Sequence, residues 1–229
     1  MLKSIKLLGI ACIALACGSG GEQAKEAASA PESKPAPTAA ASTDGNAANG
    51  KNLYMTCVAC HGENGQGNKM LNAPTIANQE PWYLERQINN FRNGLRGYKP
   101  EDTNGAQMTA MAKTLGSDDQ VKDVVAYIAT LAPVTVASTI TGGDAEKGKL
   151  SYQICAACHG ANAEGNKTLN APRLTGVDDW YLIDQYKKYG NELRGSHPED
   201  TFGAQMKAMS TTLNDEDLKN VMAYIQTLN

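Results

Sequence analysis

The sequence predicts an all-α protein that contains the same small helical domain twice. Apolar residues recur at helical spacing in several segments, and no alternating strand pattern of useful length occurs. Residues 50–115 match residues 148–213 at 36 of 66 positions with a constant offset of 98, where about four matches are expected by chance. Only 13 residues are Phe, Trp or Tyr, so helices this short should enclose a thin core. We therefore expect two domains of about 90 residues, each filled partly by something other than side chains.

Residues 1–16 have the layout of a secretory signal peptide. Lys3 and Lys6 precede an apolar run over residues 7–16, which is too short to span a bilayer. Cys17 follows this run directly and resembles the lipidated cysteine of the bacterial lipobox. The resemblance implies a lipid anchor at Cys17, and the alternative is a plain secretory signal cut shortly after Ala16.

Residues 17–45 are predicted to form a disordered tether. They are rich in Ala, Ser, Pro and Thr and contain no aromatic residue, so they cannot bury enough apolar surface to offset the entropy of ordering them. The whole chain has 21 Lys and Arg against 24 Asp and Glu, a formal charge of −3. Because no basic excess is available to neutralise phosphates, nucleic acid is excluded as a partner.

Residues 46–132 are predicted to form the first domain. One helix leads into Cys57, and a middle helix covers residues 83–93. A capping box over Ser117 to Gln120 predicts the start of the last helix. Its apolar face is expected to consist of Val121, Val124, Val125, Ile128 and Leu131.

Residues 133–142 are predicted to form an extended linker, because they are sparsely charged and lack helical periodicity. The second domain, residues 143–229, repeats the first. A helix leads into Cys155, a middle helix covers residues 181–191, and Asn214 opens the last helix. The apolar face of that helix is expected to consist of Leu218, Val221, Met222, Ile225 and Leu228.

Four of the six cysteines form two Cys-x-x-Cys-His motifs at equivalent places in the two domains. This pattern is the attachment site of c-type haem, in which two thiols add to the vinyl groups and the histidine binds the iron. Three alternatives are a thioredoxin-like redox pair, a zinc site shared by both motifs, and a disulfide within each motif. The first lacks the βαβ setting that it needs, and the last would close rings too small to brace a fold. The residues of the two motifs are Cys57, Cys60, His61, Cys155, Cys158 and His159.

Each iron needs a second axial ligand, and methionine is the residue type that the duplication favours. His197, the remaining histidine, is replaced by Lys99 in the first domain, and we expect it to be an exposed loop residue. Two methionine pairs are present in both domains, so the residues alone leave two candidates: Met108 with Met206, and Met111 with Met209. A thioether stabilises the reduced iron and raises its potential.

Each domain resembles a class I cytochrome c domain, with a haem motif that ends the N-terminal helix and a methionine some 47 residues later. The tandem pair is similar to the diheme cytochrome c-four family. The resemblance implies two tandem class I domains, each wrapped round one covalent haem c. It implies that Met108 and Met206 bind the irons, and that Met111 and Met209 are core residues.

The same resemblance implies two further features of each domain. The carbonyl groups of Pro74 and Pro172 would accept the Nδ1 protons of the two histidines. The N-terminal and C-terminal helices would cross at Gly50 and Gly148, because glycine has no side chain and allows the two helices to approach closely.

One arginine and one tryptophan are also identical at equivalent positions of the two domains. Arg96 and Arg194 are candidates for pairing with the haem propionates, and the alternative is a surface loop charge. Trp82 and Trp180 are expected to pack on the porphyrin.

These features predict an electron carrier, not an enzyme, because protein ligands fill both axial positions of each iron. The expected partners are redox proteins of the periplasm: a quinol-oxidising complex, a terminal oxidase or reductase, or a dehydrogenase. The main alternative is the cytochrome subunit of a dehydrogenase such as a flavocytochrome c sulfide dehydrogenase. A diheme peroxidase or a thiosulfate dehydrogenase would need an iron with a displaceable or unusual ligand, and the chain offers neither a spare cysteine nor a duplicated second histidine.

Overall fold

The computed structural model of the protein describes residues 44–229. The predicted signal peptide, Cys17 and all but the last two residues of the predicted tether lie outside the described residues. Within residues 44–229 there is no β-strand, and two isolated bridges join Asn68 to Ala73 and Asn166 to Ala171. The all-α prediction is therefore confirmed. None of the helices within residues 44–229 combines the length and the hydropathy that a membrane span needs.

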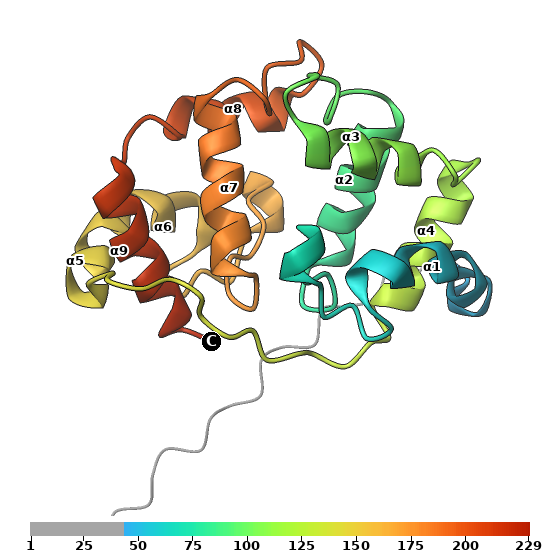
Figure 1. Ribbon diagram of the computed structural model, residues 1–229, viewed down its shortest axis with the longest axis horizontal. Coiled ribbons are helices and arrows are strands. Elements are labelled where there is room, and N and C mark those ends of the chain that lie inside the picture. The colour runs from blue at the N-terminus through green and yellow to red at the C-terminus, as the bar shows by residue number, and fades with distance from the viewer. Residues whose placement is uncertain (1–43) are drawn as a thin grey trace, which may run out of the picture. The chain divides into compact units, whose positions relative to one another are not determined.

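The helices repeat in the same order in the two domains (Figure 1). In the second domain the N-terminal helix is split at Tyr152, whose backbone keeps helical dihedral angles. The first domain contains α1 (Ala47–His61), the 3-10 helix η1 (Lys69–Leu71), α2 (Pro81–Arg92), α3 (Thr103–Ala112) and α4 (Asp118–Ile128). The second contains α5 (Ala145–Ser151), α6 (Gln153–His159), η2 (Lys167–Leu169), α7 (Asp179–Gly190), α8 (Thr201–Met209) and α9 (Asp215–Gln226).

The last helix of each domain begins where the sequence predicts. The Ser117 hydroxyl accepts a hydrogen bond from Gln120 N at 3.3 Å. The return bond of the capping box is shifted by one residue, because Gln120 Oε1 accepts from Gly116 N. Asn214 Oδ1 caps α9 by accepting from the backbone N–H groups of Glu216 and Asp217. Both helices then bury the predicted apolar face, except that Leu131 and Leu228 lie just beyond the helix ends.

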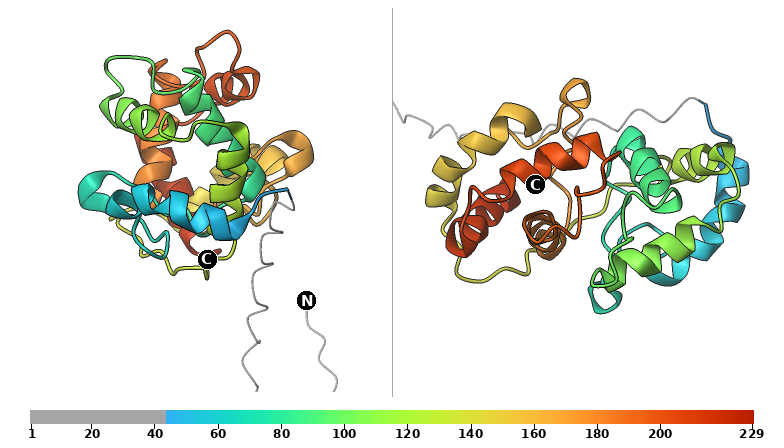
Figure 2. Two further views of the ribbon diagram at one scale, coloured as in Figure 1. Left: turned by 90° about the vertical axis from the view of Figure 1, so that its right-hand side faces the viewer. Right: turned by 90° about the horizontal axis from the view of Figure 1, so that it is seen from above.

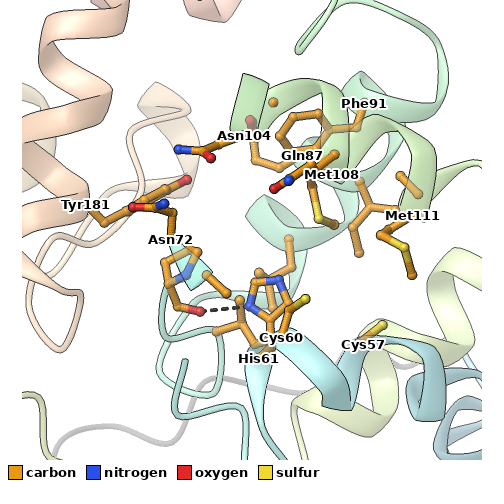
Figure 3. Close-up of a pocket in the computed structure, with 18 of the residues that line it drawn as sticks. Cys57, Cys60, His61, Asn72, Gln87, Phe91, Asn104, Met108, Met111 and Tyr181 are labelled. Carbon is orange, nitrogen blue, oxygen red and sulfur yellow. Dashed lines mark hydrogen bonds between the residues drawn. The ribbon is translucent and has the colours of Figure 1, made fainter. Parts of the chain in front are cut away.

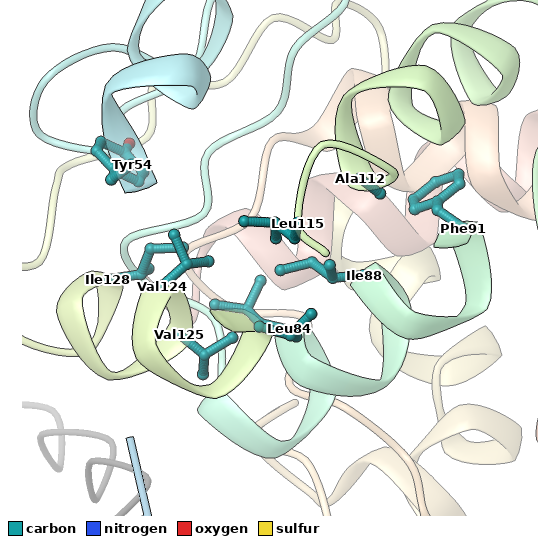
Figure 4. Close-up of a cluster of buried hydrophobic side chains, with 10 residues drawn as sticks. Tyr54, Leu84, Ile88, Phe91, Ala112, Leu115, Val124, Val125 and Ile128 are labelled. Carbon is teal, nitrogen blue, oxygen red and sulfur yellow. The ribbon is translucent and has the colours of Figure 1, made fainter. Parts of the chain in front are cut away.

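The core of the first domain lies where α2, α4 and the turn after α3 meet (Figure 4). The second cluster is smaller, with Tyr152, Ala163 and four residues of α9 buried in it. Several side chains of the first cluster also line a cavity, so one side of this core faces the cavity and not another layer of side chains. The side chains that form this cavity wall are Leu84, Ile88, Phe91, Leu115, Val124 and Ile128.

The N-terminal helix of each domain lies across the C-terminal helix, α1 on α4 and α5 on α9 (Figures 1 and 2). A Cβ atom added to Gly50 would lie 1.9 Å from the Asp123 carbonyl oxygen, and one added to Gly148 would lie 1.8 Å from the Asn220 carbonyl oxygen. Glycine is therefore required at both crossings, as expected.

Replacing Gly50 by alanine is expected to destabilise the protein by about 3 kcal/mol, because the new methyl group forces α1 away from α4. Gly116→Ala is the matched control, since its nearest neighbour, Gln120 Oε1, would lie 3.6 Å from the added atom. Thermal unfolding of the two holoproteins measures the difference. Equal unfolding temperatures would contradict a close crossing at Gly50.

Candidate functional site

The two motif histidines stand at the C-terminal ends of α1 and α6. Each helix ends because the next residue is a glycine with positive φ, +79° at Gly62 and +85° at Gly160. A buried tyrosine fixes each end: Tyr54 Oη donates to the Gly62 carbonyl at 2.8 Å, and Tyr152 Oη donates to the Gly160 carbonyl at 2.8 Å. The position of each histidine is therefore set by both backbone and core.

Each histidine ring is held by one hydrogen bond. His61 Nδ1 donates to the Pro74 carbonyl at 2.8 Å, and His159 Nδ1 donates to the Pro172 carbonyl at 2.7 Å. A carbonyl can only accept, so the proton is on Nδ1 and the Nε2 lone pair is free. Burial lowers the pKa of both histidines, which the hydrogen bond only partly offsets. Both rings are therefore neutral at pH 7 and able to bind a metal through Nε2.

Each histidine faces a cavity, and the two cavities have closely similar volumes of about 190 and 200 Å³. Figure 3 shows the first cavity, with Cys57, Cys60 and His61 on one side and Met108 and Met111 on the opposite side. Equivalent residues line the second cavity: Cys155, Cys158, His159, Met206 and Met209. The structure therefore brings the four predicted ligand and attachment residues of each domain together.

The four motif cysteines form no disulfide, and each pair lines its own cavity. A zinc ion shared by both pairs is thus incompatible with the structure. Burial raises the pKa of Cys57 and raises that of Cys155 to about 11. A nucleophilic thiol needs a lowered pKa, so neither Cys57 nor Cys155 has the properties of the attacking cysteine of a redox pair.

Both methionine pairs line the cavities. The expectation that Met111 and Met209 are core residues is wrong, because both line the cavities and neither belongs to a buried side-chain cluster. The physical reason is helix geometry, because residues three apart lie on the same face of a helix. The face of α3 that presents Met108 to the cavity therefore presents Met111 as well, and α8 repeats this with Met206 and Met209.

Arg96 and Arg194 are buried, with exposed fractions of 5% and 4%, so the surface-charge interpretation is wrong. Arg96 donates to Gln87 Oε1 at 2.8 Å and to Gln185 Oε1 at 2.7 Å. Arg194 donates to the same two oxygens at 2.9 and 2.8 Å. The tyrosine hydroxyls complete the network, Tyr181 with Arg96 and Tyr83 with Arg194.

This network joins the two cavities. Gln87 and Gln185 line both of them, whereas Arg96 lines the first and Arg194 the second. Among residues 44–229 the ion pairs involve neither arginine, and a buried charge without a counter-ion is costly. The two buried guanidinium groups on the cavity walls therefore favour the binding of anionic groups inside the cavities.

The donor set fits a haem c in each domain. Two thiols, a neutral imidazole and a thioether face a mainly apolar cavity, and a buried arginine is available for the two propionate groups. The porphyrin would occupy the space that the thin side-chain core leaves open.

The residues that line the cavities differ in part from those expected from the sequence. Trp82 and Trp180 do not line the cavities; each packs edge-on against the next residue, Tyr83 or Tyr181, which does. The expectation that His197 is exposed is wrong: it is half-buried, because its ring packs edge-on against Tyr98 with 5.4 Å between ring centroids. Gln87 and Gln185 line both cavities but were not predicted to do so. They are identical in the two domains, so a comparison of the two copies could have identified them.

The sequence profile of the cytochrome c family matches residues 47–132 and 145–229. Cytochrome c4 of Azotobacter vinelandii is 29% identical over 200 residues, 83% of this chain and 93% of the relative. The thiosulfate dehydrogenase electron acceptor of Thiomonas intermedia is 33% identical over 156 residues, 62% of this chain and 66% of the relative. The crystal structure of reduced cytochrome c4 from Pseudomonas stutzeri superposes with a TM-score of 0.64 at 26% identity, over 81% of this chain and 100% of that one.

Proposed function

The chain belongs to the cytochrome c family, in the tandem diheme arrangement of the cytochromes c4, and from this premise we propose that it is a periplasmic electron carrier with His/Met ligation at both irons. Residues 46–132 and 143–229 are the two haem domains, joined by residues 133–142. Each haem c supplies one-electron chemistry between Fe(II) and Fe(III) when it is bound.

The chain's own residues hold and orient each haem. Cys57 and Cys60 in the first domain, and Cys155 and Cys158 in the second, would attach the haems through thioether bonds. His61 with Met108, and His159 with Met206, would bind the two irons. Pro74 and Pro172 orient the imidazole rings through their carbonyl groups, which also makes the imidazoles more basic. Arg96 and Arg194 neutralise propionate charge.

The observation that carries this proposal is the equivalence of the two cavities. Each one presents a neutral histidine on one wall and a methionine pair on the opposite wall, so the protein can fill both axial positions of both irons. A catalyst needs an open or displaceable position at an iron. A carrier needs rigid ligation that changes little between the two oxidation states.

Two features support a periplasmic carrier that is tethered to a membrane. Haem attachment motifs follow a signal-like segment, residues 1–16, and Cys17 stands where a lipidated cysteine would. The tether over residues 17–45 would let the haem domains reach several redox partners.

A second candidate function is supported by one relative. The Thiomonas intermedia protein is named as the electron acceptor of a thiosulfate dehydrogenase, which favours a dehydrogenase as the donor to this chain. In the stronger form of this alternative, the chain is a permanent cytochrome subunit of such an enzyme, as in a flavocytochrome c sulfide dehydrogenase. Purification from native membranes under mild conditions separates the two, because a permanent subunit would elute with its dehydrogenase.

The carrier proposal predicts a specific holoprotein. Its mass should exceed that of the mature polypeptide by two haem masses, and reduction should take up two electrons per chain. The reduced protein should not bind carbon monoxide, because both axial positions of each iron are filled. A mass excess of one haem, or a shift of the visible spectrum with carbon monoxide, would contradict the proposal.

The anchor proposal is tested separately with Cys17→Ser. We expect this variant to move from the membrane fraction to the soluble periplasmic fraction with an unchanged visible spectrum, since Cys17 lies outside both predicted haem domains. Fractionation of cells followed by haem staining measures the change. Membrane association that survives the substitution would show that Cys17 is not the anchor.

A further inference from the structure

The peptide unit that orients each histidine has a second hydrogen bond, and its partner belongs to the other domain. The Pro172 carbonyl accepts from His159 Nδ1, and the N–H group of the same peptide unit, on Arg173, donates to Glu80 Oε2 at 2.8 Å. The first domain repeats this arrangement. Its Pro74 carbonyl accepts from His61 Nδ1, and the adjoining N–H group, on Thr75, donates to Asp178 Oδ2 at 2.7 Å.

The two arrangements are equivalent although their residues differ. Thr75 aligns with Arg173, and Glu80 aligns with Asp178, so neither pair is identical between the domains. What the two copies share is a carboxylate, at the residue just before α2 or α7, that accepts from the backbone of the other domain. The side chains of Thr75 and Arg173 do not make these bonds. The common feature is therefore the contact of a carboxylate with a peptide N–H.

A glycine leaves room for each contact. A Cβ atom on Gly165 would lie 2.5 Å from Arg173 N and 2.9 Å from Glu80 Oε1, and one on Gly67 would lie 2.6 Å from Thr75 N. Both glycines have positive φ, +85° and +78°, which other residues rarely adopt. The chain therefore keeps both peptide units accessible at the place where the carboxylates approach.

A carboxylate on the N–H side changes the carbonyl on the other side. Hydrogen bonds to an ionised acceptor are about twice as strong as neutral ones, and hydrogen bonds in a chain polarise one another. The carbonyl oxygen becomes more negative, so it holds the histidine Nδ1 proton more strongly. The imidazole then becomes a more basic iron ligand, which stabilises Fe(III) over Fe(II) and lowers the reduction potential.

We propose that Glu80 and Asp178 are positioning residues that tune the haem of the opposite domain, Glu80 through the Pro172 peptide unit and Asp178 through the Pro74 peptide unit. Each domain therefore holds down the reduction potential of its neighbour's haem. The inference rests on the proposed ligation by His61 and His159. Under this proposal, the contact between the two domains helps to set the reduction potentials of both haems.

The test uses the holoprotein with Glu80→Ala, Glu80→Gln, Asp178→Ala and Asp178→Asn. In the reduced, diamagnetic protein, the Nδ1 proton resonance of His159 should move upfield in both Glu80 variants, and that of His61 should stay in place. In both Asp178 variants, the Nδ1 proton resonance of His61 should move upfield and that of His159 should stay in place. The potential of each haem, followed through its resolved methyl resonances, should rise only in the domain opposite the substitution. The amide variants should show smaller effects than the alanine variants, because an amide oxygen still accepts the N–H bond without a full charge.

Asp184→Asn is the matched control for charge alone. The Asp184 carboxylate lies on the wall of the first cavity, paired with Lys188 at 2.9 Å, and the N–H group of the Pro74 peptide unit donates to Asp178 instead. Loss of the Asp184 charge should leave the His61 Nδ1 resonance in place, even if the reduction potential of the first haem rises. A His159 resonance unchanged in both Glu80 variants, or one that moves together with that of His61, overturns the proposal. Failure of the proposed function would instead be seen in the unsubstituted holoprotein, through its haem content or carbon monoxide binding.

Discussion

Replacing Met108 by alanine is expected to lower the reduction potential of one haem and to remove about half of the far-red charge-transfer band of the ferric protein. This weak band arises from sulfur-to-iron charge transfer, and both domains should contribute to it equally. Losing the thioether removes the ligand that favours Fe(II). The same variant should bind carbon monoxide at one haem per chain, because one axial position becomes free.

Met111→Ala is the matched control, since Met111 lines the same cavity from the next turn of the same helix. This variant should keep the far-red band. A fully buried methionine would cost roughly 2 to 5 kcal/mol on replacement by alanine. Met111 lies outside the buried core cluster of the first domain, so we expect a cost below about 2 kcal/mol.

The reverse result would reassign the ligand in both domains. If Met111→Ala loses the band and Met108→Ala keeps it, the axial ligands are Met111 and Met209, because the duplication aligns Met108 with Met206 and Met111 with Met209. Repeating the pair of substitutions at Met206 and Met209 checks this assignment within the same chain.

The elements that could be predicted from the sequence are those specified by short segments. The start of α4 at Ser117 and that of α9 at Asn214 each follow from a capping side chain next to an apolar helical face. The haem motifs are equally local, because Cys57, Cys60 and His61 lie within one helix end. Local patterns of this kind need no knowledge of the rest of the fold.

The features that could not be predicted depend on the contact between the two domains. Arg96 is buried because Tyr181 and Gln185, 85 and 89 residues away, pack around its guanidinium group. Glu80 reaches a peptide unit 93 residues away, and neither partner carries a motif. Glu80 and Asp178 also escape a comparison of identical residues between the two copies, because only their chemistry is equivalent.

Replacing both Cys57 and Cys60 by alanine is expected to have the largest effect on stability. Without thioether bonds the first domain cannot retain its haem covalently, and its cavity wall would lose the surface against which it packs. This wall consists of core residues, Leu84, Ile88 and Phe91 among them, and the small second cluster shows how little side-chain core such a domain has. The expected loss is comparable to the whole stability of a domain, about 5 to 15 kcal/mol.

The second domain of this variant should keep its own haem, because Cys155, Cys158, His159 and Met206 all come from α6 and α8. Mass measurement should therefore show an excess of one haem, and circular dichroism should show that about half of the helical signal is lost or melts at a much lower temperature. The mirror variant, with Cys155 and Cys158 replaced, should reverse the assignment. A double-alanine variant that still carries two haems would show that Cys57 and Cys60 do not attach the cofactor. Loss of both haems in each variant would mean instead that neither domain holds its haem without the other, which the buried network of Arg96, Arg194 and their shared glutamines would explain.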